Sequence, residues 1–164
     1  MKFLFIYYDK LDYFVGPMLN AIRLLPELNG RGHEVHCIIF CLDGEDAPAV
    51  RYLKAFGVCC YVSPMASSTE AKIRWILQQV EDISPDVFIP NLSVAGWYAA
   101  RWVREAGIPT IACHRSDDAF HWAMVDEFVS GHKEWAVSGL VCVSEHLKDR
   151  VLMRPVEHTK VCTI

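Results

Sequence analysis

Residues 110–118 read T-I-A-C-H-R-S-D-D, and this stretch decides how the rest of the sequence is interpreted. Four residues typical of a buried strand lead directly into His114, Arg115, a serine and two aspartates. In open parallel α/β sheets, ligands bind just beyond the carboxyl ends of the strands. If the chain forms such a sheet, His114 and Arg115 stand at the mouth of a ligand site.

The sequence on both sides of this stretch alternates between short apolar runs and longer amphipathic segments. Strands are expected at 2–8, 34–41, 58–62, 86–90, 109–113, 139–143 and 160–164. These runs are almost continuous in apolar residues, which is typical of strands covered on both faces. The alternation predicts an α/β fold, a Rossmann-like doubly wound parallel sheet. Right-handed crossovers and a switch point beside the first strand predict the strand order 3-2-1-4-5-6-7.

The segments between the strands have the period of helices with one buried face. Shared helical faces are formed by Met18, Ile22, Leu25 and Leu28, and by Ile73, Ile76, Leu77 and Val80. Residues whose side chains can cap a helix precede three of the segments: Ser67 or Ser68, Ser93, and Asp117 or Asp118. The third of these helices is expected to run from 117 to 136. Both aspartates are then interpreted first as helix caps and only second as chemical groups.

Composition limits the class of protein and its partners. The chain has 164 residues, of which 52% are hydrophobic, so we expect one domain, 1–164, with one core. A formal net charge of -4 leaves no broad basic surface for nucleic acid. No apolar run approaches the roughly 20 residues that span a bilayer, and the first residues lack a signal-peptide cleavage site. We expect a cytoplasmic protein, with peripheral association at the inner face of the membrane as the alternative.

The cysteines and histidines do not predict a metal site. Seven cysteines lie mostly within apolar runs, where a free thiol behaves as a small hydrophobic group, and a reducing compartment fits them best. The segment H-E-V-H-C at 33–37 has two histidines, but the period of a strand sends His33 and His36 to opposite faces. We therefore expect no bound metal.

Glycine motifs do not support a dinucleotide or P-loop cofactor. The turn after the first expected strand has Gly16 as its only glycine. The only G-x-G, at 30–32, follows a helix and precedes a strand, which is the reverse of the dinucleotide fingerprint. It is expected to be a helix end and turn. No G-x-x-x-x-G-K-[ST] is present.

Five motifs in order give the sequence a resemblance to a known family. After the K-F-L-F-I strand and the Gly16 turn, the chain has L-L-P-E-L-N-G-R-G-H-E-V at 24–35, P-D-V-F-I-P-N at 85–91, A-G-I-P-T-I-A-C-H at 106–114, and G-L-V-C-V-S-E-H-L at 139–147. This ordered set resembles the N-terminal domain of the family-4 glycosyltransferases, two-domain retaining enzymes of the GT-B fold. The final K-V-C-T-I resembles the strand that leads into the second domain of that family.

The resemblance implies roles for particular residues. His114 resembles the histidine that reaches the donor sugar near the reaction centre, and Gly16 resembles the loop glycine that approaches the donor. Asn91 occupies a place that often lines the acceptor pocket, and Ser144 with Glu145 resembles the V-S-E turn after the sixth strand. Arg115, beside His114, is also expected to bind substrate. Structural alternatives stay open: Gly16 as a turn residue, His114 as a cap of backbone groups, and Ser144 as a helix N-cap.

The activity that the resemblance implies is sugar transfer from a nucleotide-diphosphate sugar, with retention, to a glycan, lipid or small-molecule acceptor. The sugar nucleotide is a substrate, and no cofactor or metal is implied. The partner of this chain would be its own C-terminal domain, which grips the donor. The alternative function is a non-catalytic, flavodoxin-like α/β module that binds a small ligand or a partner at the same edge of the sheet.

Overall fold

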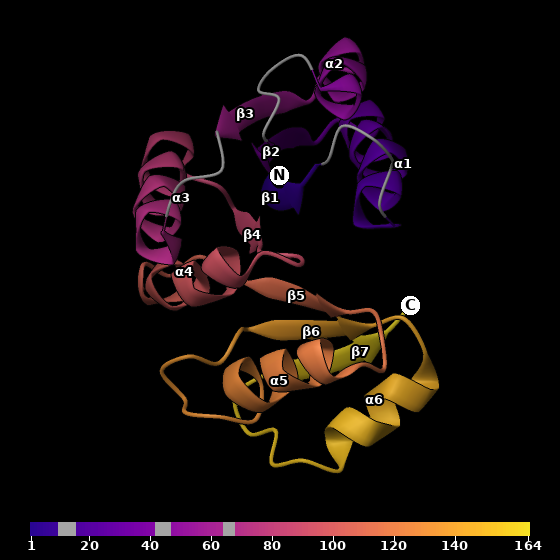
Figure 1. The fold of residues 1–164 in the computed structure, drawn as a ribbon, viewed down its shortest axis with the longest axis vertical. Helices are drawn as coiled ribbons and strands as arrows, with labels where there is room; N and C mark the ends of the chain where they lie inside the picture. Colours follow the sequence, from indigo (N-terminus) through magenta and orange to yellow (C-terminus); the bar gives the residue numbers. More distant parts are fainter. Residues whose placement is uncertain (10–15, 42–46, 64–67) are drawn as a thin grey trace.

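A computed structural model describes residues 1–9, 16–41, 47–63 and 68–164 of the chain (Figure 1). Strands and helices alternate from one end to the other, as the sequence predicts. The elements are β1 (Lys2–Tyr8), α1 (Gly16–Gly30), β2 (Glu34–Phe40), α2 (Pro48–Ala55), β3 (Cys59–Ser63), α3 (Thr69–Ile83), β4 (Val87–Ile89), α4 (Val94–Glu105), β5 (Ile111–His114), α5 (Ala119–Phe128), β6 (Gly139–Cys142), α6 (Glu145–Leu152) and β7 (Lys160–Thr163).

The strands are parallel and lie in the predicted order. One half of the sheet has the order β3-β2-β1-β4 and the other has β5-β6-β7. The halves meet at a bridge between Phe88 and Thr110, where the Phe88 amide donates to the Pro109 carbonyl at 3.0 Å. Across this seam the complete order is 3-2-1-4-5-6-7. The predicted Rossmann-like architecture is confirmed.

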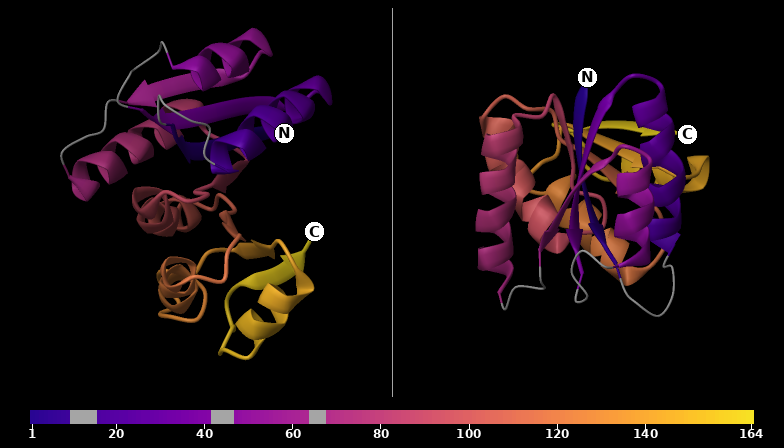
Figure 2. Two further views of the ribbon diagram at one scale, coloured as in Figure 1. Left: turned by 45° about the vertical axis from the view of Figure 1, so that its right-hand side comes forward. Right: turned by 90° about the horizontal axis from the view of Figure 1, so that it is seen from above.

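Helices cover the two faces of the sheet unequally (Figure 2). Alternate residues of β1 point to opposite sides, so Leu4 and Ile6 enter one core while Phe5 and Tyr7 enter the other. The first core contains residues from α3, α4, α5 and α6, and it extends along both halves of the sheet. The second core lies under α1 and α2 and is centred on the first half. Burial on both faces explains why the strands are continuously apolar.

Side-chain caps fix where four of the helices begin. The side-chain oxygens of Ser68, Ser93, Asp118 and Ser144 accept hydrogen bonds from backbone amides in the first turns of α3, α4, α5 and α6. Each satisfies an amide that the helix cannot pair internally. The predicted caps Ser68, Ser93 and Asp118 are confirmed. The 30–32 motif is the expected turn, since α1 ends at Gly30 and Gly32 has a φ of 85°.

Helix α5 is shorter than predicted. It ends at Phe128, whereas the sequence pattern predicted a helix to 136. The chain then turns at Gly131, and the Val137 amide donates a hydrogen bond to the Phe128 carbonyl at 2.9 Å. Arg104 of α4 donates from its guanidinium to the carbonyls of residues 133, 134 and 136. These carbonyls are thus satisfied outside a helix, so the segment forms a loop that closes against α4.

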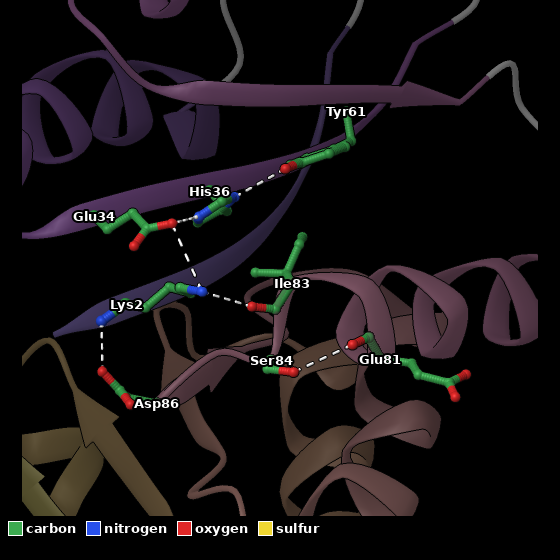
Figure 3. A network of polar contacts seen from close by, with 8 residues as sticks. All are labelled: Lys2, Glu34, His36, Tyr61, Glu81, Ile83, Ser84 and Asp86. Carbon is green, nitrogen blue, oxygen red and sulfur yellow. Dashed lines mark hydrogen bonds and ion pairs between the residues drawn. The ribbon is translucent and has the colours of Figure 1, made fainter.

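Polar side chains at the amino edge of the sheet form a network (Figure 3). The Lys2 amide donates to the Asp86 carboxylate at 2.7 Å, and the Lys2 ammonium donates to the Ile83 carbonyl at 2.8 Å. The same ammonium lies 3.7 Å from the Glu34 carboxylate. Lys2 therefore joins the starts of β1 and β2 to the end of α3 and the residue before β4.

Both ring nitrogens of His36 are paired within this network. Nε2 lies 2.7 Å from the Glu34 carboxylate and Nδ1 lies 3.0 Å from the Tyr61 hydroxyl. The hydrogen bond from His36 lowers the pKa of Glu34. His33, by contrast, packs edge-on against Phe3 on the other side of the sheet. The prediction that His33 and His36 point to opposite faces is confirmed.

Three other findings concern the described part of the chain as a whole. It contains no group of three or more histidine, cysteine, aspartate or glutamate side chains placed to hold a metal ion. No disulfide bond joins its cysteines. None of its helices has the length and the apolar character needed to cross a bilayer.

Candidate functional site

The carboxyl ends of the parallel strands meet at one edge of the sheet. Four of the residues singled out in the sequence follow these ends: Gly16 after β1, Asn91 after β4, His114 at the end of β5 and Ser144 after β6. Because β1, β4, β5 and β6 are parallel and belong to one strand order, these residues lie along a single edge. The strand order thus agrees with the predicted edge, while the closeness of these residues and their roles stay predictions.

His114 is the last residue of β5 and is almost completely buried. Only 1% of its surface is exposed, and Nε2 has no hydrogen-bond partner in the described part of the chain. Burial, with a smaller contribution from the nearby His121, lowers the pKa of His114 to about 4. The imidazole is therefore neutral at pH 7, with one N–H donor and one bare nitrogen.

Asn91 combines a rare backbone conformation with an unpaired side chain. Its φ of 47° lies in the left-handed region, which asparagine tolerates better than most residues. The Trp97 indole donates to the Asn91 carbonyl at 2.6 Å and holds this turn. Asn91 is 1% exposed, and neither atom of its amide has a partner among the described residues. The left-handed backbone and the unpaired buried polar atoms together make Asn91 a candidate site residue.

Arg115 connects β5 to the first helix. Its Nη2 donates to the Asn20 side-chain oxygen at 3.1 Å, and the same oxygen accepts from the Tyr7 hydroxyl at 3.5 Å. Its buried Nε has no partner in the described residues. Burial raises the pKa of Tyr7, so its hydroxyl stays protonated as a donor. Arg115 thus places a guanidinium between α1 and the end of β5, and its Nε–H is unpaired among the described residues.

Gly16 is the exposed first residue of α1. A Cβ atom added there would meet no described atom within 4 Å, and its φ lies outside the left-handed region. Neither close packing nor backbone conformation therefore explains the glycine. Its role toward a donor stays a prediction.

Ser144 and Glu145 have structural partners. The Ser144 hydroxyl accepts from the Leu147 amide at 3.3 Å and is the N-cap of α6. The Glu145 carboxylate accepts from the Thr163 hydroxyl and from the Lys148 ammonium, and these bonds lower its pKa. Both residues lie at the predicted edge, but their polar atoms are occupied, in contrast to those of Asn91 and His114.

The sequence interpretation missed two aromatic rings of α5 that flank His114. The Trp122 ring lies 4.6 Å from His114, and the His121 ring lies 6.0 Å from it, measured between centroids. Each ring is held by an aspartate before the helix. The Trp122 indole donates to Asp117 at 2.6 Å, and His121 Nδ1 lies 2.9 Å from Asp118. The signal was the spacing of three residues from a helix cap to a histidine, Asp118 to His121.

Helix α6 supports the far side of Trp122. The guanidinium groups of Arg150 and Arg154 lie 4.6 Å and 4.1 Å from the centre of the indole. Arg150 also forms an ion pair with Asp117, and Arg154 donates to Asp126 at 2.7 Å. The hydrogen bond from Trp122 and the charge of Arg150 lower the pKa of Asp117. The ring against His114 is therefore fixed by charges on both α5 and α6.

A groove of about 520 Å³ lies at the opposite edge of the sheet, between the ends of α3 and α4. Its lining is mainly apolar and includes Leu77, Val80, Trp102 and Ile108. It contains none of the predicted site residues. The unpaired polar atoms at the carboxyl edge, and not this groove, define the candidate site.

The parallel sheet with a polar carboxyl edge defines the class of the protein, a Rossmann-like domain of the GT-B kind. The sequence model of Glycosyltransferase Family 4 matches residues 21–164. The chain belongs to this family. No curated protein matches the sequence.

Solved structures share the fold at low sequence identity. The UDP-GlcNAc 2-epimerase from Neisseria meningitidis bound to UDP-GlcNAc is 14% identical, with a TM-score of 0.67 over 98% of this chain. The lipopolysaccharide outer core galactosyltransferase WaaB, in its apo form, is 16% identical, with a TM-score of 0.65 over 99%. Anabaena HepE, in complex with UDP and glucose, is 15% identical, with a TM-score of 0.61 over 99%. The chain spans 45%, 44% and 44% of the lengths of these three proteins.

Proposed function

We propose that this chain is the acceptor-side domain of an enzyme that transfers a sugar from a nucleotide-diphosphate sugar to an acceptor with retention. Membership of Glycosyltransferase Family 4 supports sugar transfer. The observation that carries the proposal further is the buried, unpaired Nε2 of His114 at the carboxyl edge of the sheet. An unpaired buried nitrogen is costly unless a ligand completes its hydrogen bond.

In the proposed reaction His114 orients and stabilises and does not attack. A neutral imidazole N–H can donate to an oxygen of the donor sugar as the bond between the anomeric carbon and the leaving phosphate breaks. Such a donor, fixed before reaction by packing against Trp122, strengthens its bond in the transition state. The leaving phosphate oxygen takes the proton of the acceptor hydroxyl, whose oxygen bonds to the anomeric carbon on the same face. This step requires neither a metal nor a nucleophile from the chain.

The other groups at the edge supply recognition. The Asn91 amide offers two donors and an acceptor to hydroxyl groups of an acceptor. Arg115, with Nε unpaired, offers a charged donor beside α1. Gly16, Ser144 and Glu145 are proposed as further contacts at the same edge, made through the backbone where side-chain atoms are already paired.

A second domain is proposed to hold most of the donor. The structural relatives are more than twice as long as this chain. We therefore expect the isolated 164-residue chain to transfer no sugar and to bind sugar nucleotides no better than about millimolar, about 4 kcal/mol. Isothermal titration calorimetry checks this, and a micromolar affinity would contradict it.

The test of the proposed function is turnover by the full-length protein. A panel of nucleotide-diphosphate sugars is offered with glycan, lipid and small-molecule acceptors in the presence of a chelator. Release of nucleoside diphosphate with formation of a product of unchanged anomeric configuration, identified by NMR, supports the proposal. Tight ligand binding without turnover supports the non-catalytic module instead.

A further inference from the structure

Arg115 carries a positive charge that no carboxylate of the described residues neutralises by an ion pair. The groups around its guanidinium are the Asn20 side-chain oxygen, 3.1 Å from Nη2, the Cys113 thiol and the Tyr7 hydroxyl. Burial raises the pKa of both Cys113 and Tyr7, so neither group is an anion at neutral pH. Arginine stays protonated in proteins, so the charge of Arg115 has only neutral partners within the described chain.

The other partly buried arginines of the described chain all have partners for their charge. Three of them form ion pairs: Arg101 with Glu105, Arg150 with Asp117 and Arg154 with Asp126. Arg104 donates to three backbone carbonyls. The two acids that follow Arg115 in the sequence, Asp117 and Asp118, are hydrogen-bonded to rings of α5. A partly buried charge without a counter-ion is unfavourable, so Arg115 is the arginine that an anionic ligand would complete.

The guanidinium of Arg115 is accessible at the carboxyl edge of the sheet. Arg115 is partly exposed and follows the last residue of β5. Among its guanidinium nitrogens only Nε is both buried and unpaired, so Nη1, which has no hydrogen bond to a described residue either, is open to solvent. Nη2 uses one N–H for Asn20 and has a second one free. A ligand can therefore reach Arg115 through Nη1 and Nη2, without access to the buried Nε.

The chemistry of this group selects an anion. Two parallel N–H donors on a planar cation match the two oxygens of a carboxylate or phosphate, whereas a neutral hydroxyl would leave the charge unneutralised. The first turn of α1, which precedes Asn20, has no acidic residue. The positive end of the α1 dipole therefore adds to the charge of Arg115. His114 lies against Trp122 of α5, so Arg115, on the α1 side, offers its contact to a different part of a ligand.

We propose that the acceptor substrate carries an anionic group, a phosphate or a carboxylate, and that Arg115 binds it through Nη1 and the free N–H of Nη2. Asn20 is a positioning residue in this arrangement, because its oxygen holds the guanidinium beside α1 while leaving the charge unneutralised. The inference rests on the proposed function, since it names the class of acceptor. The anion is assigned to the acceptor because the donor is proposed to be held mainly by the second domain.

Matched acceptors test the preference for an anion in the full-length protein. Glucose 6-phosphate and glucuronate are each compared with glucose, and phosphatidic acid with diacylglycerol, at a saturating concentration of the donor. We expect kcat/KM to be about tenfold to a hundredfold higher for the anionic member of the pair that the enzyme accepts. Arg115→Gln should abolish this preference by raising KM for the anionic acceptor. Arg115→Lys keeps the charge without the planar fork and should retain part of it.

Asn20→Asp separates ligand binding from a structural role. The substitution retains the oxygen that accepts from Nη2 and adds a negative charge, so it gives Arg115 a counter-ion within the chain. The melting temperature should not fall, while KM for the anionic acceptor should rise about tenfold or more. KM for the neutral acceptor should stay native. A native preference for the anionic acceptor in Asn20→Asp would overturn the inference.

The matched control is Arg23→Gln, which removes the same charge from an exposed position on α1 and should leave both KM values native. If Arg115→Gln raises KM for the sugar nucleotide and not for the acceptor, the anion belongs to the donor and the acceptor assignment is wrong. If the wild type transfers sugar to neutral and anionic acceptors equally well, the inference fails and the proposed function stands.

A measurement without turnover tests the anion site even if no acceptor reacts. The Nε–H signal of Arg115 in ¹⁵N-arginine-labelled full-length protein is assigned by its loss in Arg115→Gln. It is then followed by NMR during titration with inorganic phosphate, with the donor site filled by nucleoside diphosphate. We expect a saturable shift in the wild type and in Arg23→Gln, and a much weaker one in Asn20→Asp. A signal that phosphate leaves unmoved in the wild type would refute the anion site.

Discussion

Two buried histidines at opposite edges of the sheet differ in how their nitrogens are satisfied. His36, 6% exposed at the amino edge, has Glu34 on one nitrogen and Tyr61 on the other (Figure 3). His114, 1% exposed at the carboxyl edge, has an unpaired Nε2 and aromatic rings for neighbours. Burial alone would classify both residues as core histidines. The hydrogen bonds of the ring nitrogens distinguish the two, and the unpaired Nε2 is what makes His114 the proposed ligand contact.

The same contrast extends to the neighbours of each histidine. At the amino edge, Lys2 bonds to backbone and carboxylate oxygens around it. At the carboxyl edge, the Asn91 amide, Arg115 Nε and His121 Nε2 are all buried and unpaired among the described residues. Unpaired polar groups destabilise a fold, so several at one edge support the proposal that a ligand binds there.

The largest effect is expected from His114→Ala in the full-length protein. Loss of one preorganised donor lowers kcat by about 10²–10³, equivalent to about 2.7–4 kcal/mol, with a smaller change in KM. Steady-state kinetics beside thermal melts measure both quantities. A native kcat with a lowered melting temperature would make His114 a structural residue like His36.

The second prediction uses acid to perturb the same histidine. The folded-state pKa of His114 is about 4, below the ordinary 6.5, so the unfolded chain binds the proton more readily. The resulting stability is fully present above pH 6.5 and is lost as the pH falls toward 4, by up to about 3 kcal/mol. Urea unfolding of the wild type and of His114→Gln across this pH range measures the difference in their free energies of unfolding. Parallel curves for the two proteins would show that His114 titrates normally.

The third prediction concerns the amino edge of the sheet, where the polar side chains are paired with one another. His36→Ala leaves the Glu34 carboxylate and the Tyr61 hydroxyl without their bonds to the imidazole, and it should lower the free energy of unfolding by about 1–3 kcal/mol. The kcat of the full-length protein, measured well below its melting temperature, should stay native. A loss of kcat without a loss of stability would remove the distinction between the two edges.

The smallest effect is expected at Ser144, where the structure supplies a cap. Ser144→Ala should cost about 1 kcal/mol of stability through the lost bond from the Leu147 amide. Ser144→Asp retains an N-cap acceptor and should recover that stability. If Ser144→Asp restores the melting temperature but not the KM of the full-length protein, the serine also contacts substrate.

The sequence predicted the fold well because burial on both faces forces a recognisable pattern. Strands such as V-F-I in β4 are too short for periodicity, yet their place between capped helices identified them. The failure at α5 has a definite physical cause. The sequence analysis ran the helix through the polar run S-G-H-K-E at 130–134, in which Gly131 favours a turn. Arg104, distant in sequence, binds the carbonyls of that segment as a loop.

The sequence predicted where the candidate site lies in the fold, but it did not predict all of the residues that form it. Strand ends place Asn91 and His114 at one edge, because direction and order of the strands follow from the alternation. The roles of His121 and Trp122 depend on which way their rings point from the first turn of α5. That orientation is set by Asp117 and Asp118, which the sequence analysis interpreted first as caps and second as chemical groups. Their double role, in capping and in aiming rings, is a tertiary property.

The seam in the sheet has a mechanical consequence. In the described part of the chain, β4 and β5 meet at one bridge, whereas β1 and β2 are paired along seven residues each. The joint between the half-sheets is therefore the line across the described sheet with the fewest backbone pairs. Asn91 follows a strand of one half and His114 ends a strand of the other. The separation of these two proposed site residues therefore depends on the angle between the half-sheets.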